Sequence, residues 1–163
     1  MLLNRANIFH HYFLNLGVEL KGGFRHLPHT ADVLIEAWGR SLEEAFEYAA
    51  LGVFEVMTDT TLVQPRVEVK VTAQGFDLES LLYDWIEQLL VLFDTRQLLF
   101  SKFKVEGVRE DLTGNLQLEA RAWGEEYDPS RHESRTLIKA MTYHAMEIKK
   151  EEGFVQLRFV VDI

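Results

Sequence analysis

Two aspartates far apart in the chain are candidates for a shared cation site. Asp32 follows His29-Thr30-Ala31 and begins an alternating segment that ends at Gly39, and Asp162 is the residue before Ile163. If the two segments are neighbouring strands, both carboxylates and the terminal carboxylate form an acidic cluster, whose oxygens suit Ca²⁺ or Mg²⁺. Like charges at that distance repel, so the cluster would require a cation. The alternative is that each aspartate only caps a strand end, and spacing alone favours that interpretation.

Histidines and a lysine are further candidates. His26 and His29 are three residues apart and precede Asp32, a pattern that indicates zinc only weakly because loop geometry is undefined. We expect His29 instead to form hydrogen bonds that fix the loop of Asp32. Lys139 lies among apolar residues, and it is either a lysine that extends from a sheet edge into solvent or a cation held near the acidic site or a partner's nucleotide. His144 falls on an apolar alternation and is predicted to be a core histidine with satisfied hydrogen bonds.

The sequence carries no motif that compels an enzymatic function. It contains no glycine-rich phosphate loop and no G-x-S-x-G nucleophile elbow. It contains no cysteine, which excludes thiolate catalysis, disulfides and cysteine-ligated zinc. Glu125-Glu126 is predicted to be a solvated turn, with an extension of the acidic patch as the alternative. We therefore predict a protein that is not itself an enzyme.

Composition indicates a single globular domain. The chain has 163 residues, of which 47% are hydrophobic and 26% charged. Its formal net charge of −9 argues against direct nucleic-acid binding, although an acidic protein can bind the basic surface of a nucleic-acid enzyme. No segment has the pattern of a membrane span or a signal peptide, and we expect a cytoplasmic protein. Residues 1–23 are predicted to be an N-terminal extension of uncertain role, joined at Gly22-Gly23 to a domain over residues 24–163.

Hydrophobic periodicity predicts two helices. Ser41 to Glu44 have the pattern of a capping box, and a helical apolar stripe follows from Leu42 to Met57. Asp77 is predicted to cap the second helix. Its broad stripe is the strongest helical signal in the chain and consists of Leu78, Leu81, Leu82, Trp85, Ile86, Leu89, Leu90 and Phe93.

Alternation of apolar and polar residues predicts about seven strands. Six of them lie near residues 24–28, 32–38, 67–72, 98–108, 116–124 and 155–161. Residues 136–148 fit a helix and a strand equally well. We favour a strand for at least their second half, because the turn residues Glu151-Glu152-Gly153 need a hairpin partner upstream. The expected fold class is α+β, a single domain with a largely antiparallel sheet and two packed amphipathic helices.

Several motifs together resemble the archease family. They occur in order and cover residues 24–163. The motifs are Leu27-Pro28-His29-Thr30-Ala31-Asp32-Val33, Ala37-Trp38-Gly39 before Leu42-Glu43-Glu44-Ala45-Phe46, Met57-Thr58-Asp59, Lys139-Ala140-Met141-Thr142-Tyr143-His144 and the terminal Asp162-Ile163. Because their order and spacing match together, the resemblance is specific.

The resemblance implies a protein cofactor of the RtcB-type RNA ligase that joins tRNA halves in tRNA splicing. Such a cofactor promotes GTP-dependent guanylylation of the ligase and permits repeated turnover. Asp32, Asp162 and the main-chain oxygen of Ile163 match the family's positions for a divalent metal. Lys139 matches the lysine linked to activation, and His29 stands beside the site. The resemblance also implies a chaperone role for a tRNA methyltransferase as an alternative partner.

Two alternatives belong to different functional classes, a hydrolase and a general binding module or chaperone. A metal-dependent phosphoester hydrolase using Asp32, Asp162 and His29 would turn over substrate by itself, with activity that follows bound metal. A chaperone would suppress aggregation of its client without GTP. The acidity of the chain and the lack of a nucleophile favour an accessory protein over a hydrolase.

Overall fold

A computed structural model describes residues 21–29 and 31–163. Most of the predicted N-terminal extension therefore lies outside the described residues. Along the chain, the elements are β1 (Gly23–Pro28), β2 (Asp32–Gly39), α2 (Leu42–Met57), the 3-10 helix η1 (Thr60–Leu62), β3 (Val67–Gly75), α3 (Leu78–Arg96), β4 (Leu98–Glu110), β5 (Leu116–Glu126), β6 (Ala140–Met141), β7 (Glu147–Glu151) and β8 (Phe154–Asp162).

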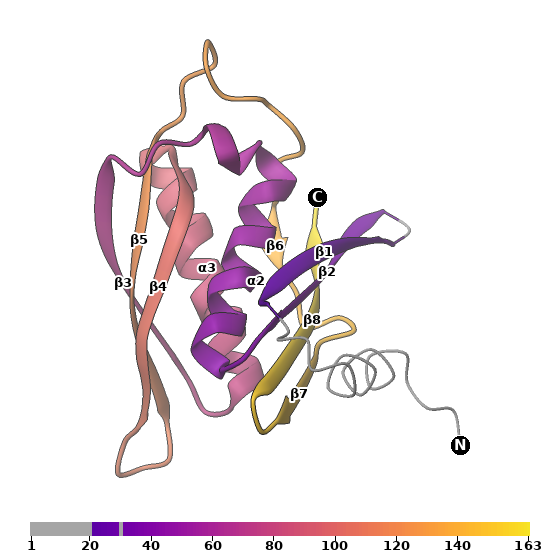
Figure 1. The fold of residues 1–163 in the computed structure, drawn as a ribbon, viewed down its shortest axis with the longest axis vertical. Helices are drawn as coiled ribbons and strands as arrows, with labels where there is room; N and C mark the ends of the chain where they lie inside the picture. Colours follow the sequence, from indigo (N-terminus) through magenta and orange to yellow (C-terminus); the bar gives the residue numbers. More distant parts are fainter. Residues whose placement is uncertain (1–20, 30) are drawn as a thin grey trace.

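The strands form two antiparallel sheets, and both helices lie between them (Figure 1). One sheet has the order β1-β2-β8-β6, with β7 also paired to β8, and the other has the order β3-β5-β4. Helix α2 contacts β2 on one side and β4 on the other, and α3 packs mainly on β3. The predicted α+β class with two packed helices is confirmed. The structure adds that the strands divide into two layers around the helices.

Helix α2 is buried on more than one face because it has a sheet on each side. Ser41 caps it as predicted, since its hydroxyl accepts a hydrogen bond from the Glu44 amide at 3.1 Å. The predicted apolar stripe is buried at Ala45, Phe46, Ala49, Val53 and Met57. A second set of residues outside that stripe is also buried: Ala50, Gly52, Phe54 and Val56. A helix that packs against the protein on one side only would have left part of this second set exposed to solvent.

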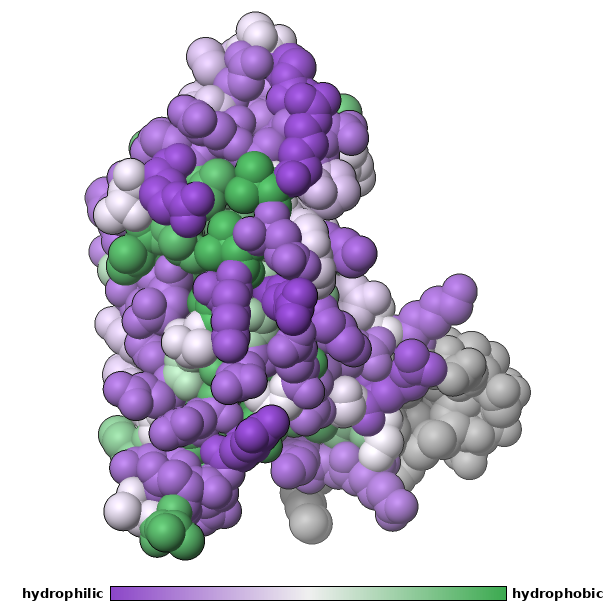
Figure 2. Space-filling view, turned by 90° about the vertical axis from the view of Figure 1, so that its left-hand side faces the viewer, coloured by the Kyte–Doolittle hydropathy of each residue, from purple (hydrophilic) through white to green (hydrophobic). Residues whose placement is uncertain are grey.

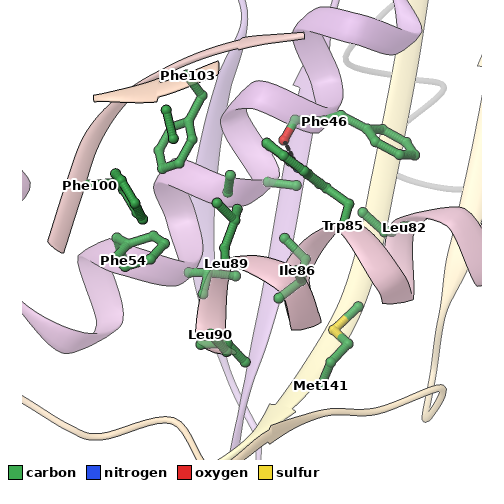
Figure 3. Close-up of a cluster of buried hydrophobic side chains, with 14 of the residues drawn as sticks. Phe46, Phe54, Leu82, Trp85, Ile86, Leu89, Leu90, Phe100, Phe103 and Met141 are labelled. Atoms are coloured by element: carbon green, nitrogen blue, oxygen red, sulfur yellow. Dashed lines mark hydrogen bonds between the residues drawn. The ribbon is translucent and has the colours of Figure 1, made fainter. Parts of the chain in front are cut away.

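The centre of the core lies where α3 meets α2 and the three-stranded sheet (Figure 3). Asp77 caps α3 with a reciprocal capping box to Ser80, which confirms that prediction. Trp85 is fully buried, and its indole nitrogen donates a hydrogen bond to the Phe46 carbonyl of α2 at 3.0 Å. Its ring contacts Phe103 edge to face, at a centroid distance of 6.2 Å. Trp85 thus joins both helices and β4 in one contact region.

The ambiguous segment, residues 136–148, contains no helix. Two short strands pair instead with the same edge of β8: β6 opposite Asp162 and Val161, and β7 opposite residues 154–158. The predicted hairpin to β8 is confirmed, and Gly153 takes the positive φ of 71° that its turn requires. β8 is central to its sheet: β2 pairs with one of its edges, and the two short strands β6 and β7 pair with the other.

The outer face of the three-stranded sheet is mostly hydrophilic, with hydrophobic side chains gathered in one area of its upper half (Figure 2). Along this face Arg121 of β5 bridges Glu68 of β3 and Glu106 of β4. The hairpin between β4 and β5 ends at the fully exposed Leu112. In the part of the chain that the structure describes, no helix is both long and apolar enough to cross a membrane.

Candidate functional site

The candidate site lies at one end of the β2–β8 pair. Asp32 begins β2, Asp162 ends β8, and the antiparallel register places these two residues directly opposite each other. Opposed residues in an antiparallel pair share a sheet face and have β-carbons roughly 4.5–5.5 Å apart. Ile35 and Ala37 of β2 are buried toward the helices, so Asp32, at the alternate position, lies on the outer face of the sheet. Both carboxylates are half-buried there.

The third strand at this end brings Lys139 to the same place in the sheet. The backbone amide of Lys139 donates a hydrogen bond to the main-chain oxygen of Asp162 at 2.8 Å. Ala140 is the residue opposite Asp162. Because side chains alternate along a strand, Ala140 lies on the same sheet face as the carboxylates, and Lys139 does not. The Lys139 side chain is exposed, and among residues 21–29 and 31–163 it forms no ion pair with either aspartate. Ile163, next in sequence, is half-buried.

The histidines near this corner differ from their predicted roles. His26 donates from Nε2 to the Gly52 carbonyl of α2 at 2.8 Å, so it is engaged with the helix. His29 Nδ1 is buried and has no hydrogen-bond partner among the described residues, which does not support a role in fixing the Asp32 loop through that atom. His144 was predicted to be a core histidine, and that is wrong. It is exposed because it lies in the turn after β6, and its ring meets the His29 ring edge to face at 5.4 Å.

The donor set at the corner is made of oxygen atoms. No group of three or more His, Asp or Glu side chains suited to a metal ion occurs in the described part of the chain. At the corner the register supplies only a pair of opposed carboxylates, with main-chain oxygen at the end of β8 beside them. These donors fit a hard cation such as Ca²⁺ or Mg²⁺, which prefers oxygen ligands. Without one, two like charges directly opposite each other destabilise the strand pair.

A buried ion cluster fixes the register that brings the aspartates together. Glu36 of β2 is only 2% exposed and lies on the same outer face as Asp32. It accepts hydrogen bonds from Arg25 Nε of β1 and from an Arg158 terminal nitrogen of β8, each at 2.8 Å. A slip of one residue would move Glu36 to the helix side and leave its charge unpaired in the core. Sequence reasoning missed this cluster, because the three residues become neighbours only through strand pairing.

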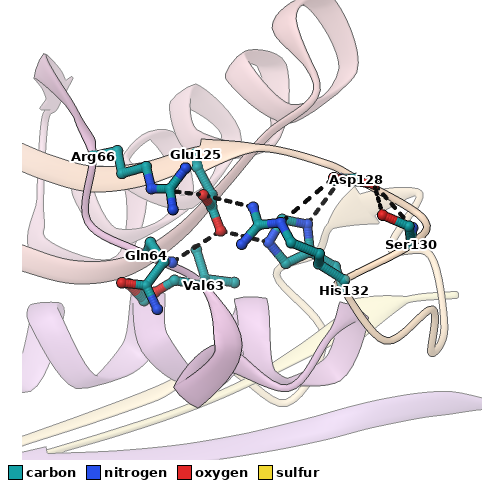
Figure 4. Close-up of polar contacts among 9 residues, drawn as sticks. Val63, Gln64, Arg66, Glu125, Asp128, Ser130 and His132 are labelled. Carbon is teal, nitrogen blue, oxygen red and sulfur yellow. Dashed lines mark hydrogen bonds and ion pairs between the residues drawn. The ribbon is translucent and has the colours of Figure 1, made fainter.

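A second buried carboxylate, Glu125, lies near the end of β5 in the three-stranded sheet (Figure 4). Glu125 was predicted to be part of a solvated turn, and that is wrong: it is 5% exposed, because β5 continues to Glu126. His132 donates to it from Nε2 at 2.7 Å, Arg131 pairs with it at 2.8 Å, and the Gln64 amide donates at 3.1 Å. The Asp128 amide donates to His132 Nδ1, which fixes the tautomer. This network closes the loop after β5 and has no link to the corner.

The electrostatics of Glu125 give a testable pH dependence. Burial alone would raise its pKa, but the hydrogen bonds from Arg131, the Gln64 amide and His132 outweigh burial and lower it from 4.5 to about 2. A lowered folded-state pKa means that the stabilisation is complete above pH 4.5 and is lost as the pH falls toward 2. We expect Glu125→Gln to lower the free energy of unfolding at pH 7 by about 1–3 kcal/mol. We also expect it to remove this part of the acid sensitivity.

Urea denaturation of the wild type and the variant at pH 7 and pH 3 measures both effects. The exposed neighbour Glu126 provides the matched control, and Glu126→Gln should leave stability and its pH dependence unchanged within about 0.5 kcal/mol. Equal losses at pH 3 in the wild type and in Glu125→Gln would contradict this account of Glu125.

Comparison with known proteins places the chain among close relatives. A sequence model of the Archease protein family matches residues 24–163. A protein called archease from Sulfolobus acidocaldarius is 56% identical over 140 residues, which cover 86% of this chain and 98% of that protein. A solution structure of a Methanobacterium thermoautotrophicum protein is 46% identical with a TM-score of 0.76, and the match covers 86% of this chain and 99% of that one.

A more distant structure shares the fold. It is the crystal structure of an archease from Thermotoga maritima, described as a possible chaperone, and it is 18% identical with a TM-score of 0.52. The match covers 85% of this chain and 96% of that one. At this identity the likeness supports the fold alone.

Proposed function

The chain belongs to the archease family, and from that membership we propose that it is a non-catalytic protein cofactor of an RtcB-type RNA ligase in tRNA splicing. In this role it promotes the GTP-dependent guanylylation of the ligase and so permits repeated turnover. The observation that supports the proposal most directly is the register of β2 and β8, which sets Asp32 opposite Asp162. Lys139 directly precedes the adjoining strand β6, and its amide donates to the Asp162 main-chain oxygen. These are the positions that the family resemblance assigns to the metal and to activation.

The proposed metal site uses the Asp32 and Asp162 carboxylates and the main-chain oxygen of Ile163. A divalent cation bound there would cancel the charge of the two opposed carboxylates, so that they no longer repel each other. The chain's own contribution is to hold both carboxylates in place, through the strand register and the Glu36 cluster. Carboxylates held in place before a partner binds lose less entropy on docking.

Lys139 is the second part of the proposed mechanism. Its backbone is fixed by the Asp162 oxygen while its side chain stays exposed, so the ammonium group is free to reach a partner. In the complex it would orient GTP phosphates or an acidic residue of the ligase. Guanylylation speeds up if this surface binds the ligase's transition state more tightly than its ground state. A contact that is equally strong in both states would tighten the complex without acceleration.

The direct test is a time course of guanylylation of the cognate ligase with labelled GTP, with and without this protein. We expect the rate, and the number of turnovers per ligase, to rise in its presence. Lys139→Met keeps the length and the apolar stem of the side chain, and it should reduce the stimulation while leaving the melting temperature unchanged. A time course that is identical with and without the protein would contradict the proposed function.

A chaperone for a tRNA methyltransferase, which the family resemblance also implies, is the second candidate. That role predicts that the protein suppresses aggregation of a methyltransferase during heating, with no requirement for GTP or the ligase. A phosphoester hydrolase is a weaker alternative, since the chain is acidic and its sequence carries no nucleophile motif. It would require turnover by the protein alone.

A further inference from the structure

Two stacked tyrosines form a surface platform that the proposed metal site does not use. Tyr83 of α3 and Tyr143 of the turn after β6 lie nearly parallel, with centroids 4.4 Å apart and an angle of 12° between the rings. Tyr83 covers one face of the Tyr143 ring, yet Tyr143 remains 54% exposed. The exposed area must therefore come from the opposite ring face and the ring edges. A flat aromatic surface is open to solvent at this position.

The turn that carries Tyr143 is held in a fixed conformation. The Thr142 hydroxyl donates to the Val160 carbonyl of β8 at 2.7 Å and accepts from the His144 amide at 3.2 Å. The Met146 amide donates to the Tyr143 carbonyl at 3.2 Å, and Ala145 has a φ of 51°. A non-glycine residue rarely adopts this left-handed conformation, which is costly and persists only where the surroundings impose it. The ring of Tyr143 is thus presented by a preorganised turn.

Two carboxylates lie near the platform, and one of them, Asp84, directly follows Tyr83 in the chain. Partial burial raises the pKa of the Tyr143 hydroxyl, and the neighbouring Tyr83, Asp77 and Asp84 raise it further. Asp77 uses one carboxylate oxygen to cap α3, and Asp84 accepts from the Gln74 amide and the Gln88 side chain. Neither aspartate forms an ion pair within residues 21–29 and 31–163. The cation–π contact found in the same residues is that of Lys102 with the Trp123 ring, on the other sheet, and it does not involve Tyr143. Tyr143 therefore lies near two carboxylates that form no ion pair with a Lys or Arg of the described residues.

We propose that the open face of Tyr143 binds an arginine side chain of a partner protein, with Asp77 and Asp84 attracting its charge. A planar guanidinium stacks on an aromatic ring and is weakly hydrated, so it loses less on leaving water than an ammonium group does. The aspartates disfavour phosphate groups, so a nucleic-acid base is the poorer fit even though bases stack on tyrosine. This site does not depend on the cation proposed at Asp32 and Asp162.

Heteronuclear NMR of the full-length protein, titrated with N-acetyl-arginine methylamide, tests the proposal. We expect saturable shifts centred on Tyr83, Asp84 and Tyr143, and a weaker response to the lysine analogue. Tyr143→Leu, which keeps an apolar side chain without the ring, should raise the dissociation constant at least about fivefold. Tyr143→Phe should restore binding to within about twofold, because it keeps the ring face. A melting curve of each variant checks that the fold is intact.

Charge is tested separately. Asp84→Asn retains an acceptor for the Gln74 amide but loses the charge, and it should weaken arginine binding severalfold. Asp94→Asn changes an exposed aspartate further along the same helix and is the control, with no expected change. Equal affinity in Tyr143→Leu and the wild type would overturn the proposal. So would stronger shifts of the same resonances by guanosine monophosphate than by arginine, since that result would assign the platform to a nucleotide.

Discussion

Replacing Asp162 with asparagine is expected to return guanylylation of the cognate ligase to the rate of the ligase alone. The variant keeps the size of the side chain and its place opposite Asp32, but it removes one of the two carboxylates proposed to hold the cation. Without metal the variant should be slightly more stable than the wild type, by about 0.2–1 kcal/mol, because two like charges no longer oppose each other. Added Ca²⁺ or Mg²⁺ should stabilise the wild type by about 2.7 kcal/mol at a hundredfold excess over its dissociation constant. The variant should lack this gain.

Melting curves with and without Ca²⁺ or Mg²⁺, run beside the guanylylation assay, measure both effects on the same samples. Asp32→Asn should behave like Asp162→Asn, since both aspartates belong to one pair. Asp94→Asn, on an exposed part of α3, should match the wild type in both assays. Full stimulation by both Asp32→Asn and Asp162→Asn would refute the proposed role of the corner. Metal-dependent stabilisation that persists in both would refute the metal site itself.

Replacing Trp85 with alanine is expected to produce the largest loss of stability in the molecule. The side chain is fully buried between α2, α3 and β4, so its removal leaves a cavity that costs about 3–5 kcal/mol. The Phe46 carbonyl also loses its indole donor in the core. Because domains of this kind are stable by about 5–15 kcal/mol, the variant should retain only part of its folding free energy. The urea midpoint should fall by roughly 1–3 M.

Val91→Ala on the same helix is the control for Trp85→Ala, since Val91 is 48% exposed and its truncation should change stability by less than about 0.5 kcal/mol. Trp85→Phe keeps a six-membered ring in the core but removes the hydrogen bond to Phe46 and the five-membered ring, so its stability should lie between those of the wild type and Trp85→Ala. A urea midpoint for Trp85→Ala that equals the wild-type value would contradict the central role given to this contact.

The local elements of the fold could be predicted because short-range rules decide them. Ser41 and Asp77 stand at helix starts, where a side-chain oxygen satisfies a free amide, and both cap their helices. The alternation of β3 and β5 follows from one face packing on helices, whereas β8 is also buried on its other face, at Gln156 and Val160. The position of the helices was not predictable in the same way. The predicted stripe of α2 left out Phe54, which packs on Phe100 of the second sheet, because a single stripe presumes one buried side.

The candidate site was predictable only in part. The pairing of Asp32 with Asp162 was a hypothesis from the sequence, since 130 residues of chain separate them and only the β2–β8 register joins them. No signal in the sequence indicated that Glu36 and Glu125 are buried, because each is paired in the fold with arginines from other segments of the chain. His144 was misplaced because its apolar neighbours fit an alternation, whereas the chain turns at Ala145 between two short strands. The metal and activation roles stay proposals.

The hairpin that joins β4 and β5 offers a practical route to measuring partner binding. Its tip residue Leu112 is fully exposed, and in Figure 1 the hairpin lies at the far end of the molecule from the C-terminus. The protein has no native thiol, so Leu112→Cys would introduce a unique attachment point for a fluorophore. Because the hairpin belongs to the other sheet, with the helices in between, a dye there should tumble with the domain without touching the acidic corner. Fluorescence anisotropy could then follow assembly with the ligase while both proposed binding surfaces keep their native side chains.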